Sequence, residues 1–456
     1  MASVGQLISA IDPIAMIINL FMCYSALATV RAMEERLIVR QFAGITSIDL
    51  TINKINVIIG PQASGKSVCA KLLFFFKNFI WQIVATVENE ETKRSLDNLC
   101  KKKFEEYFPP EYWGEKSFSI KYLIGDSFIE VFRKDDDKGK LTLAYSDSYK
   151  LLLRHLRGIN KQLIGSISES TIQASLRIPR NILGEYLYLA MPEYFPKIAS
   201  YSQLFIPAGR SFFANLQNSI FSFLSSSNSL DPFLIEFGKL YESYKSMALR
   251  RAVREDKSID AKQAFEEVDR LIEGIICAKH VRVKGTDYLV SQDGRRVNLS
   301  SSSSGQQETL PLAIILSVLP SIASRLGKTV YIEEPEAHLF PEAQRKIVEL
   351  IALTFNLNHE NLQFIITTHS PYVLTAINNL LQGGMLYAAS DGGAPQVHRV
   401  LPQHKTLSPG SLNAYAFEHG TCASIIDPES GLIDARIIDS VSDSLAIEFD
   451  ELISVY

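Results

Sequence analysis

The sequence lacks any close pair of cysteines. The five cysteines are scattered, odd in number and form no CxxC pair; they are Cys23, Cys69, Cys100, Cys277 and Cys422. Disulfide frameworks and zinc sites both need closer or paired spacing, and a chain without such pairs suits a reducing compartment. We therefore expect a cytoplasmic location.

The sequence also lacks a large excess of acidic or basic residues. The formal net charge is −4 and the pI is about 6.1, so no global field favours nucleic acid, although a local basic surface is still allowed. The sequence has no internal repeat, and no heptad run is long enough for an extended coiled coil. With 456 residues, 46% hydrophobic and 21% charged, it has a globular composition and the length for one large domain or two.

A long apolar run lies near the N-terminus, at residues 13–30, broken by Asn19 and Ser25. A membrane helix needs about 20 such residues, so this run is borderline. The residues before it contain no Lys or Arg, which a signal peptide would carry. Two interpretations stay open, a membrane anchor and an extension preceding a translation start at Met33. We expect no membrane association.

Local patterns predict the order of elements. Residues 37–60 predict three short strands, of which the third, INVIIG, is a continuous apolar run typical of a buried strand. Residues 117–146 predict antiparallel strands, residues 150–278 are mainly helical, and HVRVKGTDYLVSQDGRRVNL predicts a hairpin with Asp293-Gly294 at its turn. From there to about residue 375 helices alternate with strands, which indicates a parallel sheet covered by helices.

The loop Gly60–Ser67 has the spacing G-x-x-x-x-G-K-S between a predicted strand and a predicted helix. In such a loop the backbone N–H groups face phosphates, and the helix N-terminus adds positive potential. Lys66 can reach the β and γ phosphates, and the Ser67 hydroxyl can ligate Mg²⁺. The candidate nucleotide-binding residues here are Gly60, Pro61, Gln62, Ala63, Ser64, Gly65, Lys66 and Ser67.

An acidic motif, YIEEPEAHLFP, spans Tyr331–Pro341. Its apolar strand delivers two carboxylates to the C-terminal edge of the sheet, where open α/β sheets bind ligands. Because side chains alternate along a strand, Glu333 and Glu334 should point in different directions. One can then serve a metal while the other orients or deprotonates water. The alternative is an acidic helix cap after a core strand.

Two weaker motifs flank the acidic one. The serine run ending in Ser303–Gln306 opens an apolar helix, and its hydroxyls, amides and helix dipole suit a γ-phosphate; taken alone, it would be a linker. His369 follows the apolar strand QFIITT, where a lone histidine is more often structural. Their order and spacing around Glu334, far downstream of the glycine-rich loop, favour one shared site.

In this order the motifs resemble those of ABC-type ATPases, specifically the AAA-like prokaryotic branch of the SMC, RecF and OLD proteins. They also resemble the stand-alone ATPase subunits of anti-phage defence systems such as Septu and PARIS. The resemblance covers residues near 37–78 and 295–375 and is weak between them. It implies ATP and Mg²⁺ as cofactors. The implied catalytic residues are Glu334, His369 and Lys66, the metal ligands Ser67 and Glu333, and the signature motif Ser303, Ser304, Gly305 and Gln306.

Three segments fit the pattern less well. Glu333 stands where the resemblance implies an aspartate, and the glutamate has a longer reach to the metal. No glutamine stands out for the Q-loop, so Gln82 and Gln203 are both guesses. LFIPAGRSFF, with Arg210, is similar to a segment often seen in this branch, and we expect it to form a buried strand and turn.

The resemblance implies an α/β P-loop NTPase fold with an ABC-type ATPase head. Such a head has a mainly parallel core sheet flanked by helices, an antiparallel β-subdomain and here an inserted helical block. The predicted divisions are an apolar extension (1–32), an N-terminal ATPase lobe with Walker A (33–149), a helical insertion (150–278), a C-terminal ATPase lobe with signature, Walker B and switch histidine (279–380), and a hairpin with an acidic helical tail (381–456).

In this family the nucleotide lies between two subunits, so the resemblance implies an ATPase that forms a homodimer or a higher homo-oligomer. The segment after His369 is too short for the Toprim nuclease domain of OLD proteins and lacks its DxD motif. We therefore expect a sensor or scaffold subunit of an anti-phage system that controls a separate effector nuclease.

Two alternatives stay open. One is a RecF-like DNA-repair ATPase, in which Lys101–Lys103 and Arg250, Arg251 and Arg254 contact DNA phosphates. Such runs are more often solvated helix faces. The other is the ATPase subunit of a transporter, which the long middle block disfavours and the N-terminal apolar run keeps open.

Overall fold

The computed structural model describes residues 34–134, 140–169, 183–184, 194–215, 231–251, 259–323, 327–390, 395–434 and 446–453. The chain divides into two units, Met1–Glu34 and Glu35–Tyr456, and the fold described below is that of the second. The apolar run at residues 13–30 lies outside the described residues.

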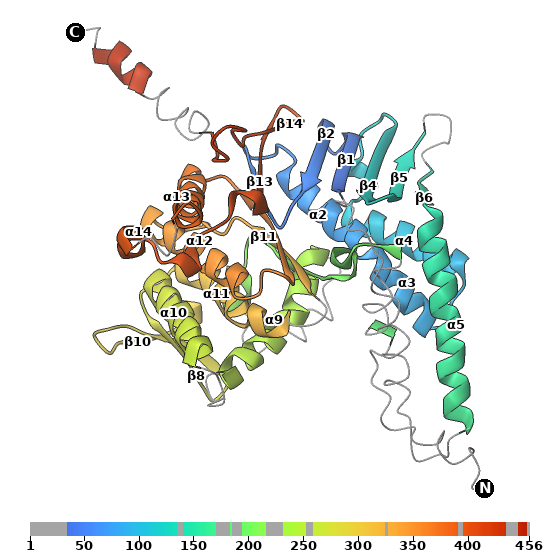
Figure 1. Cartoon of the computed structure of the whole chain (residues 1–456), viewed down its shortest axis with the longest axis horizontal. Helices are drawn as coiled ribbons and strands as arrows, with labels where there is room; N and C mark the ends of the chain where they lie inside the picture. Colours follow the sequence, from blue (N-terminus) through green and yellow to red (C-terminus); the bar gives the residue numbers. More distant parts are fainter. Residues whose placement is uncertain are drawn as a thin grey trace. The chain divides into compact units, whose positions relative to one another are not determined.

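Eleven strands form one mixed sheet (Figure 1). Its antiparallel part consists of β6 (Thr142–Tyr145), β5 (Ser127–Arg133), β4 (Phe118–Ile124), β1 (Glu35–Phe42) and β2 (Ile45–Ile52). Its parallel part consists of β13 (Leu412–Glu418), β3 (Ile55–Ile59), β12 (Leu362–Thr368), β11 (Lys328–Glu333) and β7 (Ser202–Ile206). β14 (Thr421–Ser424) lies between the two parts, antiparallel to β13 and paired with β2 only at Ser47.

Helices cover both faces of this sheet, and a second, three-stranded sheet is attached. The helices are α2 (Lys66–Lys77), α3 (Phe79–Glu88), α4 (Lys93–Tyr107), α5 (Asp147–Glu169), α7 (Ser211–Asn215), α9 (Pro232–Arg251), α10 (Ile259–Ile276), α11 (Ser304–Ile322), α12 (Pro341–Asn356), α13 (Pro371–Ala388) and α14 (Pro395–Val400). Single 3₁₀ turns are η2 (Pro110–Tyr112), η3 (Lys197–Ser200), η4 (Leu299–Ser301), η5 (Gln403–Lys405) and η6 (Pro409–Ser411). The small sheet has the order β10 (Arg296–Asn298), β9 (Thr286–Val290) and β8 (Lys279–Val283).

The burial of each strand follows its hydrophobic pattern. β4 alternates between buried and half-buried residues, as a strand with one covered face should. All seven residues of β12 are buried, because helices cover both sides of the parallel part. β3, which is apolar except for the buried Asn56, likewise lies between two other parallel strands, β13 and β12.

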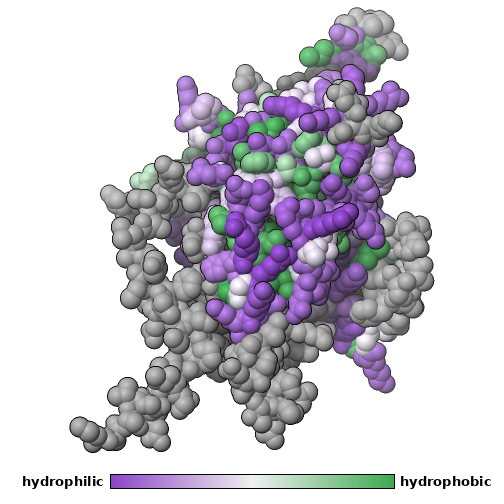
Figure 2. Space-filling view, turned by 90° about the vertical axis from the view of Figure 1, so that its right-hand side faces the viewer, coloured by the Kyte–Doolittle hydropathy of each residue, from purple (hydrophilic) through white to green (hydrophobic). Residues whose placement is uncertain are grey.

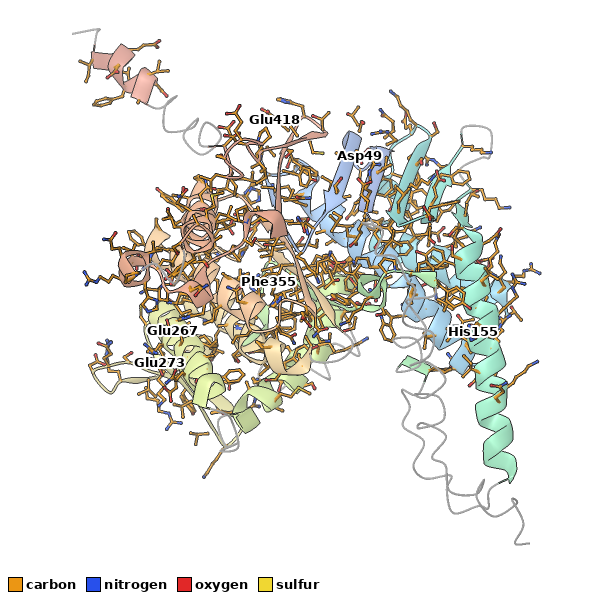
Figure 3. The ribbon with its side chains drawn as sticks, viewed as in Figure 1. Asp49, His155, Glu267, Glu273, Phe355 and Glu418 are labelled. Atoms are coloured by element: carbon orange, nitrogen blue, oxygen red, sulfur yellow. The ribbon has the colours of Figure 1, made fainter. Side chains whose placement is uncertain are left out.

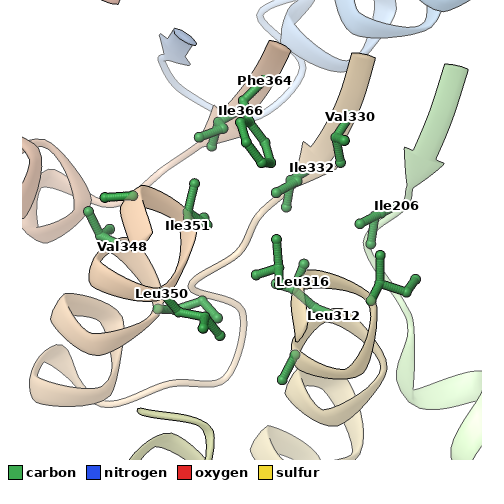
Figure 4. Close-up of a cluster of buried hydrophobic side chains, with 14 of the residues drawn as sticks. Ile206, Leu312, Leu316, Val330, Ile332, Val348, Leu350, Ile351, Phe364 and Ile366 are labelled. Atoms are coloured by element: carbon green, nitrogen blue, oxygen red, sulfur yellow. The ribbon is translucent and has the colours of Figure 1, made fainter. Parts of the chain in front are cut away.

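The parallel strands separate two hydrophobic cores. Side chains on one face pack against α7 and α9–α13, and those on the other pack against α2–α5. Figure 4 shows part of the first core, where β11 and β12 face α11 and α12 through Val330, Ile332, Phe364, Ile366, Leu312, Leu316, Val348 and Ile351. On the opposite face, Tyr331 of β11 packs edge-on against Phe74 of α2, with 5.6 Å between ring centroids.

One segment of the described residues, Lys66–Glu88, is long and apolar enough to cross a membrane, but 72% of its apolar window is buried inside the fold. It consists of α2 and α3, which belong to the second core. Most described side chains on the face in Figure 2 are hydrophilic, and the hydrophobic ones are scattered. In Figure 3, Phe355 lies among interior side chains, whereas Glu267 and Glu273 lie on α10.

This architecture confirms the predicted α/β fold class, with a parallel core sheet, flanking helices and an antiparallel β-subdomain. The hairpin predicted over residues 280–299 is only part of what forms there. The structure has a second turn at Lys284-Gly285, so three strands form there instead of two. The mainly helical block at 150–278 also contributes β7 to the edge of the main sheet, where LFIPAGRSFF was expected to form a strand and turn; the sequence did not indicate that this strand pairs with β11.

Candidate functional site

The glycine-rich loop joins the end of β3 to the start of α2. Gly65 has a φ of 99°, and a Cβ there would lie 2.8 Å from Ile45 Cγ1. A Cβ on Gly60 would lie 2.3 Å from the carbonyl oxygen of Phe417 in β13. Glycine is therefore required at both ends of the loop, by conformation at Gly65 and by the close approach of another strand at Gly60.

The Lys66 side chain folds back over this loop. Its Nζ donates hydrogen bonds to the carbonyl oxygens of Gly60 (2.7 Å) and Pro61 (2.6 Å). Burial lowers the pKa of Lys66, and the nearby carboxylates Glu334 and Glu336 oppose that effect. The loop thus holds a cation beside its own backbone amides, at the N-terminus of a helix, where phosphates bind.

Glu333 and Glu334 point in different directions, as the alternation of strand side chains predicts. Glu333 lies on the α2 face of β11, two residues after Tyr331, and is 7% exposed. Its Oε2 accepts a hydrogen bond of 3.3 Å from the Ala208 N–H. The Glu334 side chain is 38% exposed, and its Oε1 lies 3.1 Å from Nε2 of His369.

Glu334 has a φ of 44°, an unusual value for a residue other than glycine. Such a conformation costs on the order of 1 kcal/mol and persists only when its surroundings fix it. Here the Glu334 N–H donates to the Thr367 carbonyl at 2.9 Å. Arg210 Nη2 donates to the Glu334 carbonyl at 3.0 Å. The structure therefore fixes Glu334 from both sides.

His369 connects the acidic motif to the glycine-rich loop. Its Nδ1 lies 3.4 Å from Lys66 Nζ, and its Nε2 faces Glu334. Glu336, which sequence reasoning left without a role, accepts hydrogen bonds at Oε1 from the His369 N–H (2.8 Å) and the Thr368 hydroxyl (2.7 Å). A carboxylate three residues after Glu333 was the available signal, but its partner on β12 is not visible in the sequence.

One pocket of about 560 Å³ brings Lys66, Glu334 and His369 together, whereas Gly60, Pro61, Glu333 and Glu336 do not line it. Its size is typical of a site for a small organic ligand. It is lined by Ala43, Gln62, Ala63, Ser64, Gly65, Lys66, Ser67, Val68, Tyr112, Glu334 and His369. Ala43 and Tyr112 had no sequence signal. Tyr112 is 62% exposed and offers an aromatic ring at the pocket wall.

The Ser303–Gln306 turn does not line this pocket. Ser303 is the N-cap of α11 and forms a capping box with Gln306, so the turn is structured and the linker interpretation is wrong. A Cβ on Gly305 would lie 2.7 Å from the His338 carbonyl oxygen. Ser303 and Ser304 are exposed. The turn is thus held against the His338 backbone, within the acidic motif, and its two serines are exposed.

The chemistry of the two predicted metal ligands suits Mg²⁺. Ser67 lines the pocket, whereas Glu333 does not, although its Oε1 is buried and has no hydrogen-bond partner among the described residues. Within the described residues no group of three or more His, Cys, Asp or Glu could hold a metal. Mg²⁺ is commonly held by one or two carboxylates together with substrate phosphates, so a sparse protein ligand set is expected.

Neither Q-loop guess lies at the pocket. Gln203 Nε2 donates to the Tyr201 carbonyl at 2.5 Å, and its Oε1 accepts from the Tyr331 hydroxyl at 2.7 Å. Gln82 is buried in α3. Both side chains serve packing on the α2 face of the sheet, so the structure corrects both interpretations.

Comparison with known proteins gives one family match. Residues 188–375 match the family described as "AAA domain, putative AbiEii toxin, Type IV TA system". The matched segment contains β7, the Ser303–Gln306 turn, the two glutamates and His369. The predicted resemblance to AAA-like ATPases is thereby confirmed for this part of the chain.

Two curated relatives are similar over shorter segments. The "Retron Vc95 probable ATPase" of Vibrio cholerae is 30% identical over 123 residues, which are 25% of this chain and 23% of that protein. The "Retron Ec83 probable ATPase" of Escherichia coli is 27% identical over 169 residues, 34% of this chain and 30% of that protein. The matches therefore span less than a third of the length of either relative.

Among solved structures, the chain is similar to the SMC head domain from Thermotoga maritima. The TM-score is 0.34 at 12% identity, covering 86% of this chain and 98% of that one. It is also similar to an SmcHead bound to the C-winged helix domain of ScpA. There the TM-score is 0.38 at 12% identity, covering 86% of this chain and 96% of that one.

Proposed function

We propose that this chain binds and hydrolyses ATP with Mg²⁺, and that two copies close around the nucleotide. One observation carries the proposal: Lys66, Glu334 and His369, from three separate elements, meet at one pocket whose wall is the glycine-rich loop. The AAA-domain match and the naming of both relatives as probable ATPases support the same activity.

Each group has a role that follows from its position. The loop amides and the N-terminus of α2 hold the phosphates, and Lys66 neutralises the β and γ oxygens. Ser67 and Glu333 would hold Mg²⁺, which when bound would neutralise negative charge on the phosphates. Glu334 orients the attacking water and accepts its proton, while His369 and Lys66 stabilise charge that develops on the transferred group.

A second copy would complete the site. The Ser303–Gln306 turn offers exposed hydroxyls and a helix N-terminus for a γ-phosphate, but it lies away from the pocket of its own chain. Two exposed aromatic side chains lie nearby in the sequence: Phe340 (79%) near the end of the acidic motif and Tyr372 (55%) three residues after His369. Aromatic residues are enriched at interfaces, so these rings suit contact with the partner.

We further propose a role in anti-phage defence. The two relatives are named as retron ATPases, and the family description names a toxin of a toxin–antitoxin system. In this role the chain is a cytoplasmic sensor or scaffold whose nucleotide state controls a separate effector nuclease. The RecF-like alternative has less support, because Lys102 in the basic run of α4 is exposed and already pairs with Glu106 at 3.8 Å. Arg254 lies outside the described residues.

Glu334→Gln tests the proposal. The change keeps the shape of the side chain and removes its capacity to accept a proton, so turnover should fall by about 10²–10⁴-fold. ATP binding should persist, and the variant should elute as a stable dimer only with ATP and Mg²⁺. Glu429→Gln, which alters an exposed carboxylate elsewhere, is the control.

Unchanged turnover in Glu334→Gln would contradict the assigned role, and the absence of any nucleotide-dependent change in size would contradict the composite site. Duplex DNA added to the same assay decides the alternative. Binding that weakens steeply with salt would favour direct action on DNA.

A further inference from the structure

Arg210 joins three segments of the fold at the edge of the nucleotide pocket. Its side chain is fully buried, at 0% exposure. Nη1 donates to the carbonyl oxygens of Pro207 (3.0 Å) and Glu333 (2.7 Å), and Nη2 donates to that of Glu334 (3.0 Å). Nε donates to the Glu308 carbonyl at 3.1 Å. One guanidinium thus holds the ends of β7 and β11 and the first turns of α11.

The Glu308 carboxylate closes the network from the α11 side. Its Oε1 accepts the backbone N–H of Arg210 at 2.9 Å, and its Oε2 accepts that of Ser211 at 2.8 Å. Oε1 also lies 3.4 Å from Arg210 Nε, with both side chains buried. Glu308 follows Gly305 by three residues, so it lies about one helical turn beyond that glycine.

A buried charge is retained only where its donors are satisfied. The guanidinium is planar and carries five N–H donors in a fixed arrangement, so it can donate hydrogen bonds to several carbonyl oxygens at once. A lysine would place one compact charge there and could not hold the same set. The chemistry of the site therefore calls for arginine, and the acceptors it holds are the backbone oxygens of both acidic residues.

The geometry points to Arg210 as a positioning residue that couples the Ser303–Gln306 turn to Glu334. A displacement of α11 moves Glu308, and with it the guanidinium that holds the Glu334 carbonyl. When the turn binds the γ-phosphate in the partner's pocket, the movement is then transmitted to Glu334, which orients water in the pocket of its own chain. This inference rests on the proposed ATPase function.

Arg210→Lys and Glu308→Gln test the coupling, with Arg295→Lys as control because Arg295 is exposed and pairs only locally with Asp293. Hydrogen exchange of residues 333–340 is measured first, without nucleotide. We expect this segment to exchange faster than wild type in both variants and at the wild-type rate in the control. Affinity for fluorescent ADP should stay within about threefold, since the glycine-rich loop is untouched, a change of well under 1.4 kcal/mol.

Turnover gives the second readout. In Arg210→Lys, kcat should fall by about 100-fold with KM nearly unchanged, the loss expected when a catalytic group is slightly misplaced. If wild type and variants all fail to hydrolyse ATP, the proposed function fails, but the exchange result still decides whether Arg210 positions Glu334. Unchanged exchange in both variants overturns the inference, and so does unfolding of both, because the network would then be structural only.

A double-mutant cycle tests the direction of the coupling. Ser303→Ala removes a hydroxyl of the turn, and its effect on kcat is compared in wild-type and Arg210→Lys backgrounds. If Arg210 transmits the state of the turn, Ser303→Ala should slow wild type but should not slow Arg210→Lys further. If the fold-losses in kcat of the two single variants multiply in the double variant, the two sites act independently and the coupling is overturned.

Discussion

The Nε2 atom of His369 lies 3.1 Å from Oε1 of Glu334, and both side chains remain about one-third exposed, at 31% and 38%. The other ring nitrogen, Nδ1, lies 3.4 Å from Lys66 Nζ. The imidazole therefore stands between the cation of the glycine-rich loop and the carboxylate that would orient water. All three side chains line the pocket, so a ligand that fills it would lie against these contacts.

Lys66→Ala should weaken ATP binding by about 100-fold, the loss expected when a charged hydrogen-bonding group to phosphate is removed. Lys71→Ala is the matched control, because Lys71 lies on the same helix but pairs with Asp231 at 2.8 Å. Isothermal titration of both variants measures the effect. ATP affinity close to wild type in Lys66→Ala would contradict the location of the phosphate site.

Glu333→Gln should reduce the gain in ATP affinity that Mg²⁺ provides by about 10-fold, because ligand charge sets the affinity of oxygen sites for hard cations. The amide keeps an oxygen for the Ala208 N–H, so the fold should be preserved. ADP affinity in the presence of EDTA should match wild type. A variant that retains the full effect of Mg²⁺ would show that Glu333 is not a ligand.

The same substitution should have opposite effects at two helical glycines. A Cβ on Gly305 would meet the His338 carbonyl at 2.7 Å, whereas a Cβ on Gly158 in α5 meets nothing within 4 Å. Gly305→Ala should cost about 1–3 kcal/mol through overpacking. Gly158→Ala should gain about 0.5–1 kcal/mol through helix propensity. Thermal unfolding shows whether each variant is more or less stable than wild type. If Gly305→Ala is also stabilising, the backbone at His338 can shift to admit the methyl group, and the prediction is wrong.

Stability should rise with pH through a buried lysine. Burial lowers the pKa of Lys328 from its ordinary value of 10.5 to about 8. Between these values the unfolded chain holds a proton that the folded chain has released, so the folded state gains about 3 kcal/mol as pH rises from 8 to 10.5. Lys328→Met should lose this gain. Urea unfolding of both proteins at pH 7.5 and 10.5 tests it, and a difference independent of pH would refute it.

The local features of the site could be predicted from the sequence. The glycine-rich loop needs its residues in one short segment. β11 and β12 each have an apolar centre, and Glu333-Glu334 and His369 lie at or just after their ends. The carboxyl ends of parallel strands lie at one edge of a sheet. The order of strands in the sequence therefore predicted that the glycine-rich loop, Glu334 and His369 lie close together. Their roles in catalysis stay predictions.

What could not be predicted depends on contacts between distant segments. Nothing near Arg210 in the sequence identifies the Glu333 and Glu334 carbonyls as its acceptors, because that contact requires β7 to pair with β11. Tyr112 reaches the pocket from a 3₁₀ turn whose sequence carries no functional pattern. The separation of Ser303–Gln306 from its own pocket likewise depends on how α11 packs.

The position of β3 has a consequence for how the protein is made on the ribosome. β3 leads into the glycine-rich loop, yet its two neighbours in the sheet, β12 and β13, come from the last part of the described chain. At about 5–20 residues per second, an emerging β3 waits roughly tens of seconds before either partner is translated. During that interval an apolar strand has both edges unpaired, a state prone to aggregation. The strand that leads into the glycine-rich loop is therefore completed on both edges only late in synthesis, well after the loop itself has been made.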